Sequence, residues 1–193
     1  ELVVANENQK RGTIAILAEK DKLEMEEENR MRVGNTKNTR VICRSGSPND
    51  PADLEIISPH TARSIIILPP HEGDADAAVI KTCLALTHAP GRASSPYNIV
   101  TQIQEENNLE ILRMIGRNDR ISAILTRNII ARVMAQTSRQ SGLSVVYTEL
   151  LNFGGDEIYF HEEPTLSGKT FGNALLAYED SAVIGIQRAD GTT

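Results

Sequence analysis

The hydrophobic pattern of the first 126 residues alternates between short apolar runs and longer charged or amphipathic stretches. Five apolar runs have the length of strands covered on both faces of a sheet, at residues 13–19, 39–44, 64–70, 97–103 and 120–126. The stretches between them predict helices at residues 20–33, 51–58, 77–88 and 108–116. This order predicts an α/β fold with a doubly wound parallel sheet and right-handed crossovers.

The first twelve residues predict the last turns of a helix that Gly12 closes, with no capping residue ahead of Glu1. We therefore expect the chain to start inside a domain and the sheet to be an incomplete Rossmann-like sheet whose first strand is missing. A glycine-rich dinucleotide turn would then lie before Glu1.

The pattern changes after residue 126. Two amphipathic helices are predicted on either side of Gly142, and we interpret them as a helix-turn-helix crossover. After Gly154 and Gly155, a strand, a helix and a strand of a small α+β lobe are predicted at residues 156–163, 165–180 and 181–191. The expected domains are a Rossmann-like lobe at 1–126, a crossover pair at 127–153 and the beginning of a C-terminal lobe at 154–193.

The composition narrows the classes of partner. The net charge is −6, from 20 Lys and Arg against 26 Asp and Glu, and no basic stripe is interleaved with aromatic residues, so nucleic acid is not expected to bind. Cys43 and Cys83 lie in apolar stretches without CxxC spacing, which is typical of reduced core thiols in a cytosolic protein. No apolar run reaches the roughly 18 residues of a membrane-spanning helix, so this fragment itself is expected to be soluble.

Polar residues follow several of the predicted strands. In open α/β sheets, ligands bind outside the carboxyl ends of the strands. The residues at those positions are Glu19, Lys20 and Asp21, then Arg44, Ser45, Gly46, Ser47 and Pro48, then Pro69 and Pro70, and finally Gln104 and Glu105. We expect them to converge on one rim of the sheet, and we call it the carboxyl rim.

The first two strand ends carry the main binding candidates. The carboxylate of Glu19 is placed to accept hydrogen bonds from a ribose diol, although an acid at a strand end is also common on a plain surface. Gly46 allows close approach of the backbone, and Ser45 and Ser47 offer hydroxyls. Arg44 is expected to pair with a phosphate or with a carboxylate such as Glu19 or Asp21. The alternative for residues 44–48 is a turn of small residues that leads into a capped helix.

Other acidic residues are weaker candidates. The charged run at residues 19–32 is typical of a solvated helix face, although carboxylates of this kind also bind divalent cations. Asp74, Asp76 and Glu105 are secondary candidates, and helix capping is the favoured alternative for the two aspartates. The histidines lack metal-binding spacing, and no Tyr-x-x-x-Lys couple, GxSxG elbow or P-loop is present, so catalysis is not expected.

Several stretches together resemble one family. They are RGTIAILAEKDKLEMEEE, TRVICRSGSPNDPADLEIISPHTARSIIILPP, DADAAVIKTCLALT and RQSGLSVVYTELLNFGGDEIYF. They look like the cytoplasmic region of CASTOR/POLLUX-type (DMI1-like) ion channels and their bacterial relatives, a region of the RCK, or TrkA-N-like, group. CRSGSP with the following ADLEIIS is the most specific match. The segment from Gly168 through Phe171 to Arg188 resembles the start of an RCK C-terminal lobe.

The resemblance implies a gating module without catalysis. Copies of it would pair and assemble into a ring below the transmembrane pore of the same polypeptide, on the cytoplasmic face of a membrane. Residues 44–48 replace the Gly-Asp pair with which ordinary RCK domains contact a nucleotide, which argues against plain NAD or ATP binding. The plant relatives of the group point toward calcium, which is therefore the favoured ligand; NAD or an adenine nucleotide is the alternative. Glu19 and Asp21 occupy the position of the group's ribose-binding acid and are the first candidates for either ligand.

Two other functions fit the residues. An NAD(P)-dependent oxidoreductase or epimerase fragment could have its glycine-rich turn before Glu1, or the chain could be an assembly domain with a vestigial ligand rim. As a separate prediction, apolar surface on the helices at 77–88 and 127–152 indicates symmetric self-association through one or both of them.

Overall fold

The computed structural model describes residues 1–90, 92, 94–153 and 157–187. The chain divides into two compact units, Glu1–Asp156 and Glu157–Thr193, which are considered separately. The predicted break at Gly154 and Gly155 and the end of the last predicted strand lie outside the described residues, and the three-domain division stays a prediction.

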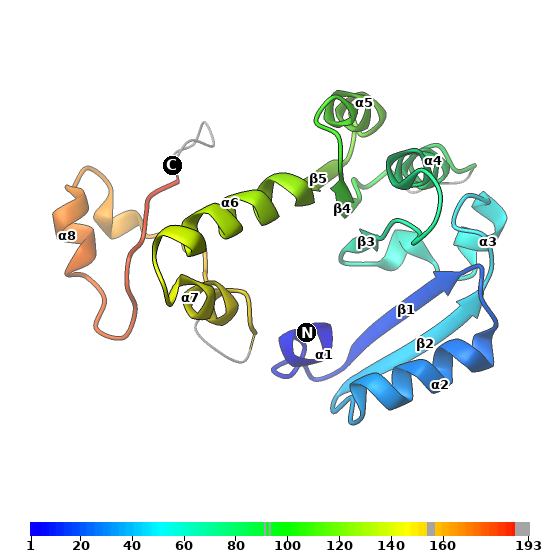
Figure 1. Cartoon of the computed structure of the whole chain (residues 1–193), viewed down its shortest axis with the longest axis horizontal. Helices are drawn as coiled ribbons and strands as arrows, with labels where there is room; N and C mark the ends of the chain where they lie inside the picture. Colours follow the sequence, from blue (N-terminus) through cyan, green and yellow to red (C-terminus); the bar gives the residue numbers. More distant parts are fainter. Residues whose placement is uncertain (91, 93, 154–156, 188–193) are drawn as a thin grey trace. The chain divides into compact units, whose positions relative to one another are not determined.

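The first unit contains the five predicted strands, and all of their pairings are parallel (Figure 1). They are β1 (Gly12–Ala18), β2 (Thr39–Ser45), β3 (Ile65–Ile67), β4 (Asn98–Ile103) and β5 (Arg120–Leu125). A helix lies between each consecutive pair, because parallel strands need a crossover connection. The predicted α/β class with an open, Rossmann-like parallel arrangement is confirmed.

One detail of the sheet differs from the prediction. The strands form two sheets, β1-β2 and β3-β4-β5, rather than one continuous sheet.

Three helices of this unit begin at an aspartate that caps them. Asp21, Asp50 and Asp74 each accept hydrogen bonds from backbone amides in the first turn of the helix that follows. The helices are α1 (Leu2–Ala5), α2 (Lys22–Val33), α3 (Pro51–Glu55), the 3₁₀ turn η1 (Pro59–Thr61), α4 (Ala75–Thr87) and α5 (Asn108–Ile115). The charged helix α2 buries only Met25, as expected for a helix with a solvated face.

The core lies where α4 packs against the three-stranded sheet. Its buried members are Leu54, Ile67, Val79, Cys83, Leu86, Tyr97, Ile99, Ile103 and Leu112. Cys43 and Cys83 are both buried free thiols, as predicted, and burial raises the pKa of Cys83 to about 11. At Gly116 a Cβ would overlap the side chain of Ile121, so this turn after α5 requires glycine.

An ion pair fixes the amino ends of β4 and β5. Arg92 pairs with Asp119, and the same carboxylate accepts a hydrogen bond from the Tyr97 amide at 2.7 Å. The guanidinium lies over the Tyr97 ring, 4.6 Å from its centroid. It also donates to the carbonyl of Thr87 at 3.2 Å, so one arginine connects the end of α4 to the starts of two strands.

Two helices follow β5, as the sequence predicts. They are α6 (Thr126–Arg139) and α7 (Leu143–Leu150), joined at Gly142, whose φ of 92° suits glycine. They pack against each other and form the α6–α7 hairpin, and neither helix has a buried side chain.

The structure of the second unit differs from the prediction. Residues 157–163 and 181–187 were expected to form strands, but no strand occurs between residues 157 and 187. The predicted helix at 165–180 is reduced to the 3₁₀ turn η2 (Pro164–Leu166) and the short helix α8 (Phe171–Leu175), which a Thr170–Asn173 capping box begins. An isolated strand leaves its backbone groups unpaired, so these apolar segments do not become strands without a partner.

Candidate functional site

The structure brings the ends of β1 and β2 together at the carboxyl rim. Ala18 and Ser45 are the last paired residues of the two strands, so residues 19–21 and 46–48 leave the sheet side by side. The Ser47 hydroxyl donates to the carboxylate of Glu19, and the Ser45 hydroxyl donates to the Lys20 carbonyl at 2.7 Å. Four of the predicted binding residues, Glu19, Ser45, Gly46 and Ser47, therefore form one cluster, which we call the rim cluster.

A further carboxylate holds this loop in place. The Ser47 amide donates to Asp53 at 2.7 Å, and the Gly46 amide donates to the Ala18 carbonyl at 3.1 Å. A Cβ on Gly46 would lie 3.0 Å from both the Asp53 carboxyl carbon and a Leu17 methyl group, so glycine allows the loop to pack closely. The sequence analysis missed Asp53; its signal was an acid in the first turn of the helix that follows the loop.

The two remaining primary candidates have local roles. Asp21 accepts hydrogen bonds from the amides of Leu23 at 2.9 Å and Glu24 at 3.1 Å, and so caps α2. The Arg44 guanidinium donates to the Cys43 carbonyl at 2.9 Å and makes no ion pair within the described residues. The expected pairing of Arg44 with Glu19 or Asp21 is therefore wrong, because Ser47 and the α2 amides already engage those carboxylates.

The charges next to the rim cluster are largely paired within α2. Lys20 contacts Glu24 at 3.2 Å and Glu28 at 2.5 Å, and Lys22 contacts Glu26 at 3.6 Å. Hydrogen bonding to Glu28 raises the pKa of Lys20, and the same contact lowers the pKa of Glu28. Both groups are exposed, so these contacts order a surface and contribute little stability.

The rim cluster offers fewer ligands than a calcium site requires. Calcium takes six to eight oxygen ligands, often with several carboxylates among them. The cluster offers the Glu19 carboxylate, two serine hydroxyls and the Lys20 carbonyl, and these groups bond to one another. Within the described ranges, no three His, Cys, Asp or Glu side chains gather closely enough to hold a metal ion. Calcium at this rim stays a prediction.

Asp74 and Asp76, two of the secondary candidates, have different structural roles. Asp74 caps α4 through the Ala77 amide at 3.0 Å, as its capping interpretation predicts. Asp76, only 5% exposed, accepts hydrogen bonds from the amides of Gln104 at 2.9 Å and Glu105 at 3.0 Å and from the Asn108 side chain at 2.7 Å. It therefore anchors the β4–α5 loop rather than capping its own helix.

The environment of Asp76 favours its charged form. Burial alone would raise its pKa, but the hydrogen bonds from Asn108 and the two loop amides, together with the charge of Arg127, hold the pKa below its usual value. Arg127 also binds the side chains of Gln104, at 2.9 Å, and Glu105. Glu105 is thus paired, and Arg127 is a second residue that sequence reasoning missed.

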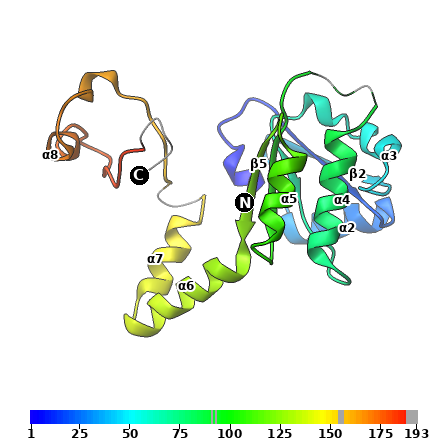
Figure 2. The same ribbon diagram turned by 90° about the horizontal axis from the view of Figure 1, so that it is seen from above.

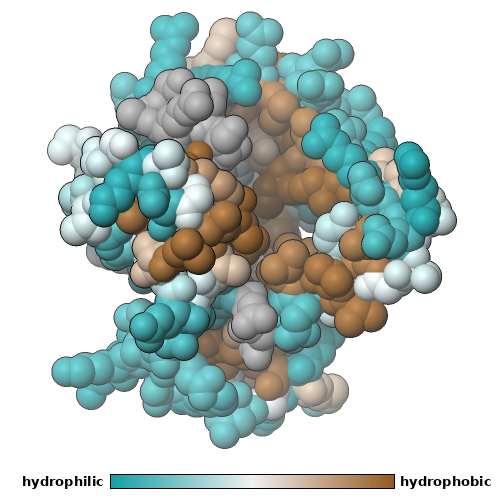
Figure 3. Space-filling model, turned by 90° about the vertical axis from the view of Figure 1, so that its left-hand side faces the viewer, coloured by the Kyte–Doolittle hydropathy of each residue, from teal (hydrophilic) through white to brown (hydrophobic). Residues whose placement is uncertain are grey.

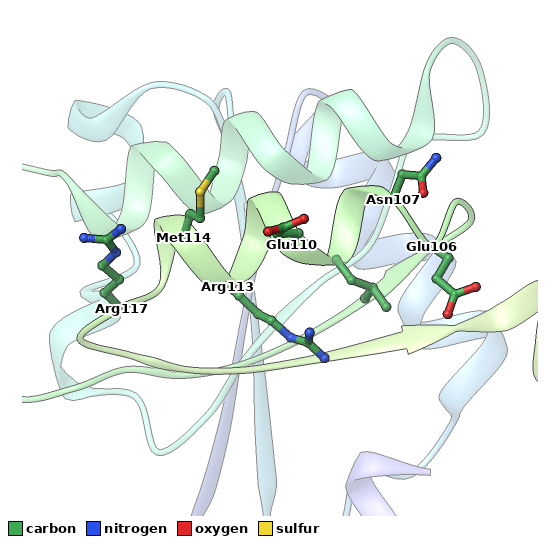
Figure 4. Close-up of a pocket in the computed structure, with 7 residues that line it drawn as sticks. Glu106, Asn107, Glu110, Arg113, Met114 and Arg117 are labelled. Atoms are coloured by element: carbon green, nitrogen blue, oxygen red, sulfur yellow. The ribbon is translucent and has the colours of Figure 1, made fainter.

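A hollow elsewhere in this unit does not coincide with the rim cluster. It measures ≈ 640 Å³ and is lined by Glu106, Asn107, Leu109, Glu110, Arg113, Met114 and Arg117 (Figure 4). All of these residues come from α5 and its two ends, and Figure 4 shows their side chains spread along one helix. It contains no predicted binding residue.

Comparison with known proteins adds a decisive observation. Residues 127–193 match the family described as "Castor and Pollux, part of voltage-gated ion channel". Over 192 residues, 98% of this chain, it is 34% identical to the Probable ion channel CASTOR of Oryza sativa subsp. japonica and to the Ion channel CASTOR of Lotus japonicus. It is 31% identical to the Probable ion channel POLLUX of Arabidopsis thaliana over 194 residues, 99% of this chain.

Over nearly its whole length the chain is similar to CASTOR/POLLUX-type ion channels. The resemblance inferred from the four sequence stretches is thereby confirmed. The chain spans 21%, 22% and 23% of the lengths of these three relatives, about a fifth of each. Among the described residues, no helix is both long and apolar enough to cross a membrane.

Proposed function

We propose that this chain is a ligand-sensing regulatory domain of a cation channel or potassium transport protein. In this proposal it is a gating-ring module of the RCK type on the cytoplasmic face of a membrane, and it catalyses no reaction. The observation that carries the proposal is the match of nearly the whole chain to proteins named as ion channels. No feature of the described residues favours the oxidoreductase or epimerase alternative over it.

The rim cluster is the proposed ligand site. It lies at the carboxyl ends of parallel strands, where open α/β sheets bind ligands. Glu19 supplies its negative charge and Ser45 and Ser47 its neutral oxygens, and a ligand would exchange their mutual hydrogen bonds for its own. A ligand held there regulates a pore only through different affinities for two conformations of the assembly.

Self-association is proposed through the α6–α7 hairpin. Its exposed apolar residues are Ile129, Ile130, Met134, Val145, Val146, Leu150 and Leu151. In contrast, α4 buries six of its residues within its own unit, and its exposed large apolar side chain is Leu84. Apolar surface is open to solvent on the side of the molecule drawn in Figure 3. A second copy that covered the hairpin would remove such surface from water and give a dimer, and a second interface would join such dimers into a ring.

Ligand titration tests the proposed site. The protein is titrated by calorimetry with calcium, NAD, NADH, ATP and ADP in turn, as wild type and as Glu19→Gln. We expect calcium to bind and its affinity to fall roughly tenfold in Glu19→Gln, since the variant loses the only carboxylate charge of the rim cluster. Asp21 is left unchanged because its removal would uncap α2.

Glu27→Gln is the matched control. Glu27 is exposed on the neighbouring helix and makes no ion pair within the described residues, so it removes the same charge without touching the rim. If a nucleotide binds instead of calcium and Glu19→Gln weakens its binding, the proposed site is retained and its ligand is a nucleotide. Equal affinities in the two variants for every ligand would contradict the rim site.

A further inference from the structure

A chain of polar contacts connects α4 to the first turn of α6. The buried carboxylate of Asp76 accepts hydrogen bonds from two consecutive amides of the β4–α5 loop, those of Gln104 and Glu105. The side chains of the same two residues bind the Arg127 guanidinium, Gln104 at 2.9 Å and Glu105 as an ion pair. The loop is thus held from one side through its backbone and from the other through its side chains.

The sheet register explains why these residues meet. Ile103 and Leu125 are the last paired residues of β4 and β5, so the β4–α5 loop and the start of α6 leave the sheet next to each other. Arg127 follows two residues after Leu125, at the second position of α6. Its side chain therefore reaches back across the strand ends to the loop.

Few other contacts restrain the direction of α6; beyond α7, the Phe153 amide donates to the Glu1 carboxylate at 3.4 Å. The helix runs from Thr126 to Arg139 and buries no side chain, and no side-chain cap bonds to its first turn. In Figure 2, α6 continues from β5 and extends away from α4 and α5. Its packing partner is α7, which has no buried side chain either. The side chains of Arg127 and Glu105 are more than 60% exposed, so their ion pair is weak, but it acts on a helix whose orientation few other contacts fix.

We propose that Arg127 is a positioning residue that fixes the direction of the α6–α7 hairpin relative to the sheet. The buried Asp76 carboxylate holds the backbone of Gln104 and Glu105 in place, and Arg127 attaches the hairpin to the side chains of these two residues. A ligand-induced change at the carboxyl rim that shifted the β4–α5 loop would therefore reorient the hairpin, which is the proposed pairing surface. That regulatory consequence rests on the proposed function, whereas the positioning itself does not.

The experiment measures the orientation of α6 directly. Spin labels are placed on cysteines introduced at Lys81, exposed on α4, and at Ser138, exposed on α6. The native Cys43 and Cys83 are buried and remain unlabelled. Distances between the two labels are measured in protein diluted with unlabelled copies, so that only pairs within one chain contribute.

Arg127→Ala should broaden the distance distribution and shift its mean, and amide exchange in the first turns of α6 should accelerate about two- to five-fold. Exchange in α4 and β4 should not change. The matched control is Arg132→Ala, which removes an exposed arginine of the same helix that makes no ion pair within the described residues. It should leave the distribution as in wild type.

A charge exchange separates positioning from a general loss of structure. The double variant Glu105→Arg with Arg127→Glu restores the ion pair in reverse and should restore a narrow distribution, whereas each single change should broaden it. Arg127→Ala behaving like Arg132→Ala, or a double variant no narrower than the singles, would overturn the proposal. Because the measurement needs neither ligand nor pore, its failure leaves the proposed ligand site standing, and failure of ligand binding leaves the positioning role standing.

Discussion

Replacing Asp119 with alanine should lower the free energy of unfolding of the first unit by about 3 to 5 kcal/mol. The Asp119 side chain is 1% exposed and that of its partner Arg92 is 15% exposed, so the change leaves a nearly buried guanidinium without its counter-charge. The Tyr97 amide, which donates to the same carboxylate at 2.7 Å, also loses its acceptor. Urea unfolding followed by circular dichroism measures the effect.

The control for Asp119 is Glu26→Ala on α2. Glu26 pairs with Lys22 at 3.6 Å, and both side chains are more than 40% exposed, so its loss should cost about 0.5 kcal/mol or less. Arg92→Ala combined with Asp119→Ala should be less destabilising than the sum of the two single changes, because the double variant has no uncompensated charge. An Asp119→Ala variant as stable as Glu26→Ala would show that the Arg92–Asp119 ion pair does not stabilise the amino ends of β4 and β5.

Replacing Met134 with glutamate should shift the protein from an assembled form towards the monomer. Met134 is 67% exposed within its own chain and lies on the apolar side of α6. Burying a side chain of this size in an interface contributes about 1.5 to 3 kcal/mol, so a charge there should weaken association by roughly tenfold or more. Sedimentation velocity over a range of protein concentrations measures the shift.

Met31→Glu gives a closely matched comparison for Met134→Glu. Met31 is a methionine on α2 that is 75% exposed, so the chemistry and the starting exposure are nearly the same while the surface differs. We expect Met31→Glu to sediment like wild type. A wild-type protein that stays monomeric at high concentration, or equal effects of the two substitutions, would contradict pairing through the hairpin.

Local sequence signals predict most of the first unit. Apolar runs of strand length are properties of a few neighbouring residues, and Asp74 acts as the helix cap that its capping interpretation predicts. The rim cluster was predictable for a related reason, because the carboxyl ends of adjacent parallel strands must lie side by side.

Most of the contacts that sequence reasoning missed are distant along the chain. Asp74 and Asp76 look equivalent in the sequence, yet Asp76 is buried because its partners come from residues 104–108. Arg92 and Asp119, or Arg127 and Glu105, carry no local mark that pairs them. Arg44 was paired wrongly because the capping of α2 by Asp21 and the Ser47 contact to Glu19 were not considered as competitors.

The second unit shows the limit of the hydrophobic pattern. Residues 157–163 contain Ile158, Tyr159 and Phe160 in a run suited to a strand, but all three side chains are exposed and none of the three residues belongs to a strand. A strand is stable only with a neighbour that satisfies its backbone, and the sequence of the run itself does not reveal whether one is present.

The central claim is that the rim cluster senses a ligand that controls an ion channel. Its most direct test is ion flux through the full-length protein reconstituted in liposomes, recorded against calcium concentration on the face that carries this domain. The account predicts a flux that responds to calcium, with the response moved to higher calcium in Glu19→Gln and unchanged in Glu27→Gln. Responses that coincide in wild type, Glu19→Gln and Glu27→Gln would contradict it.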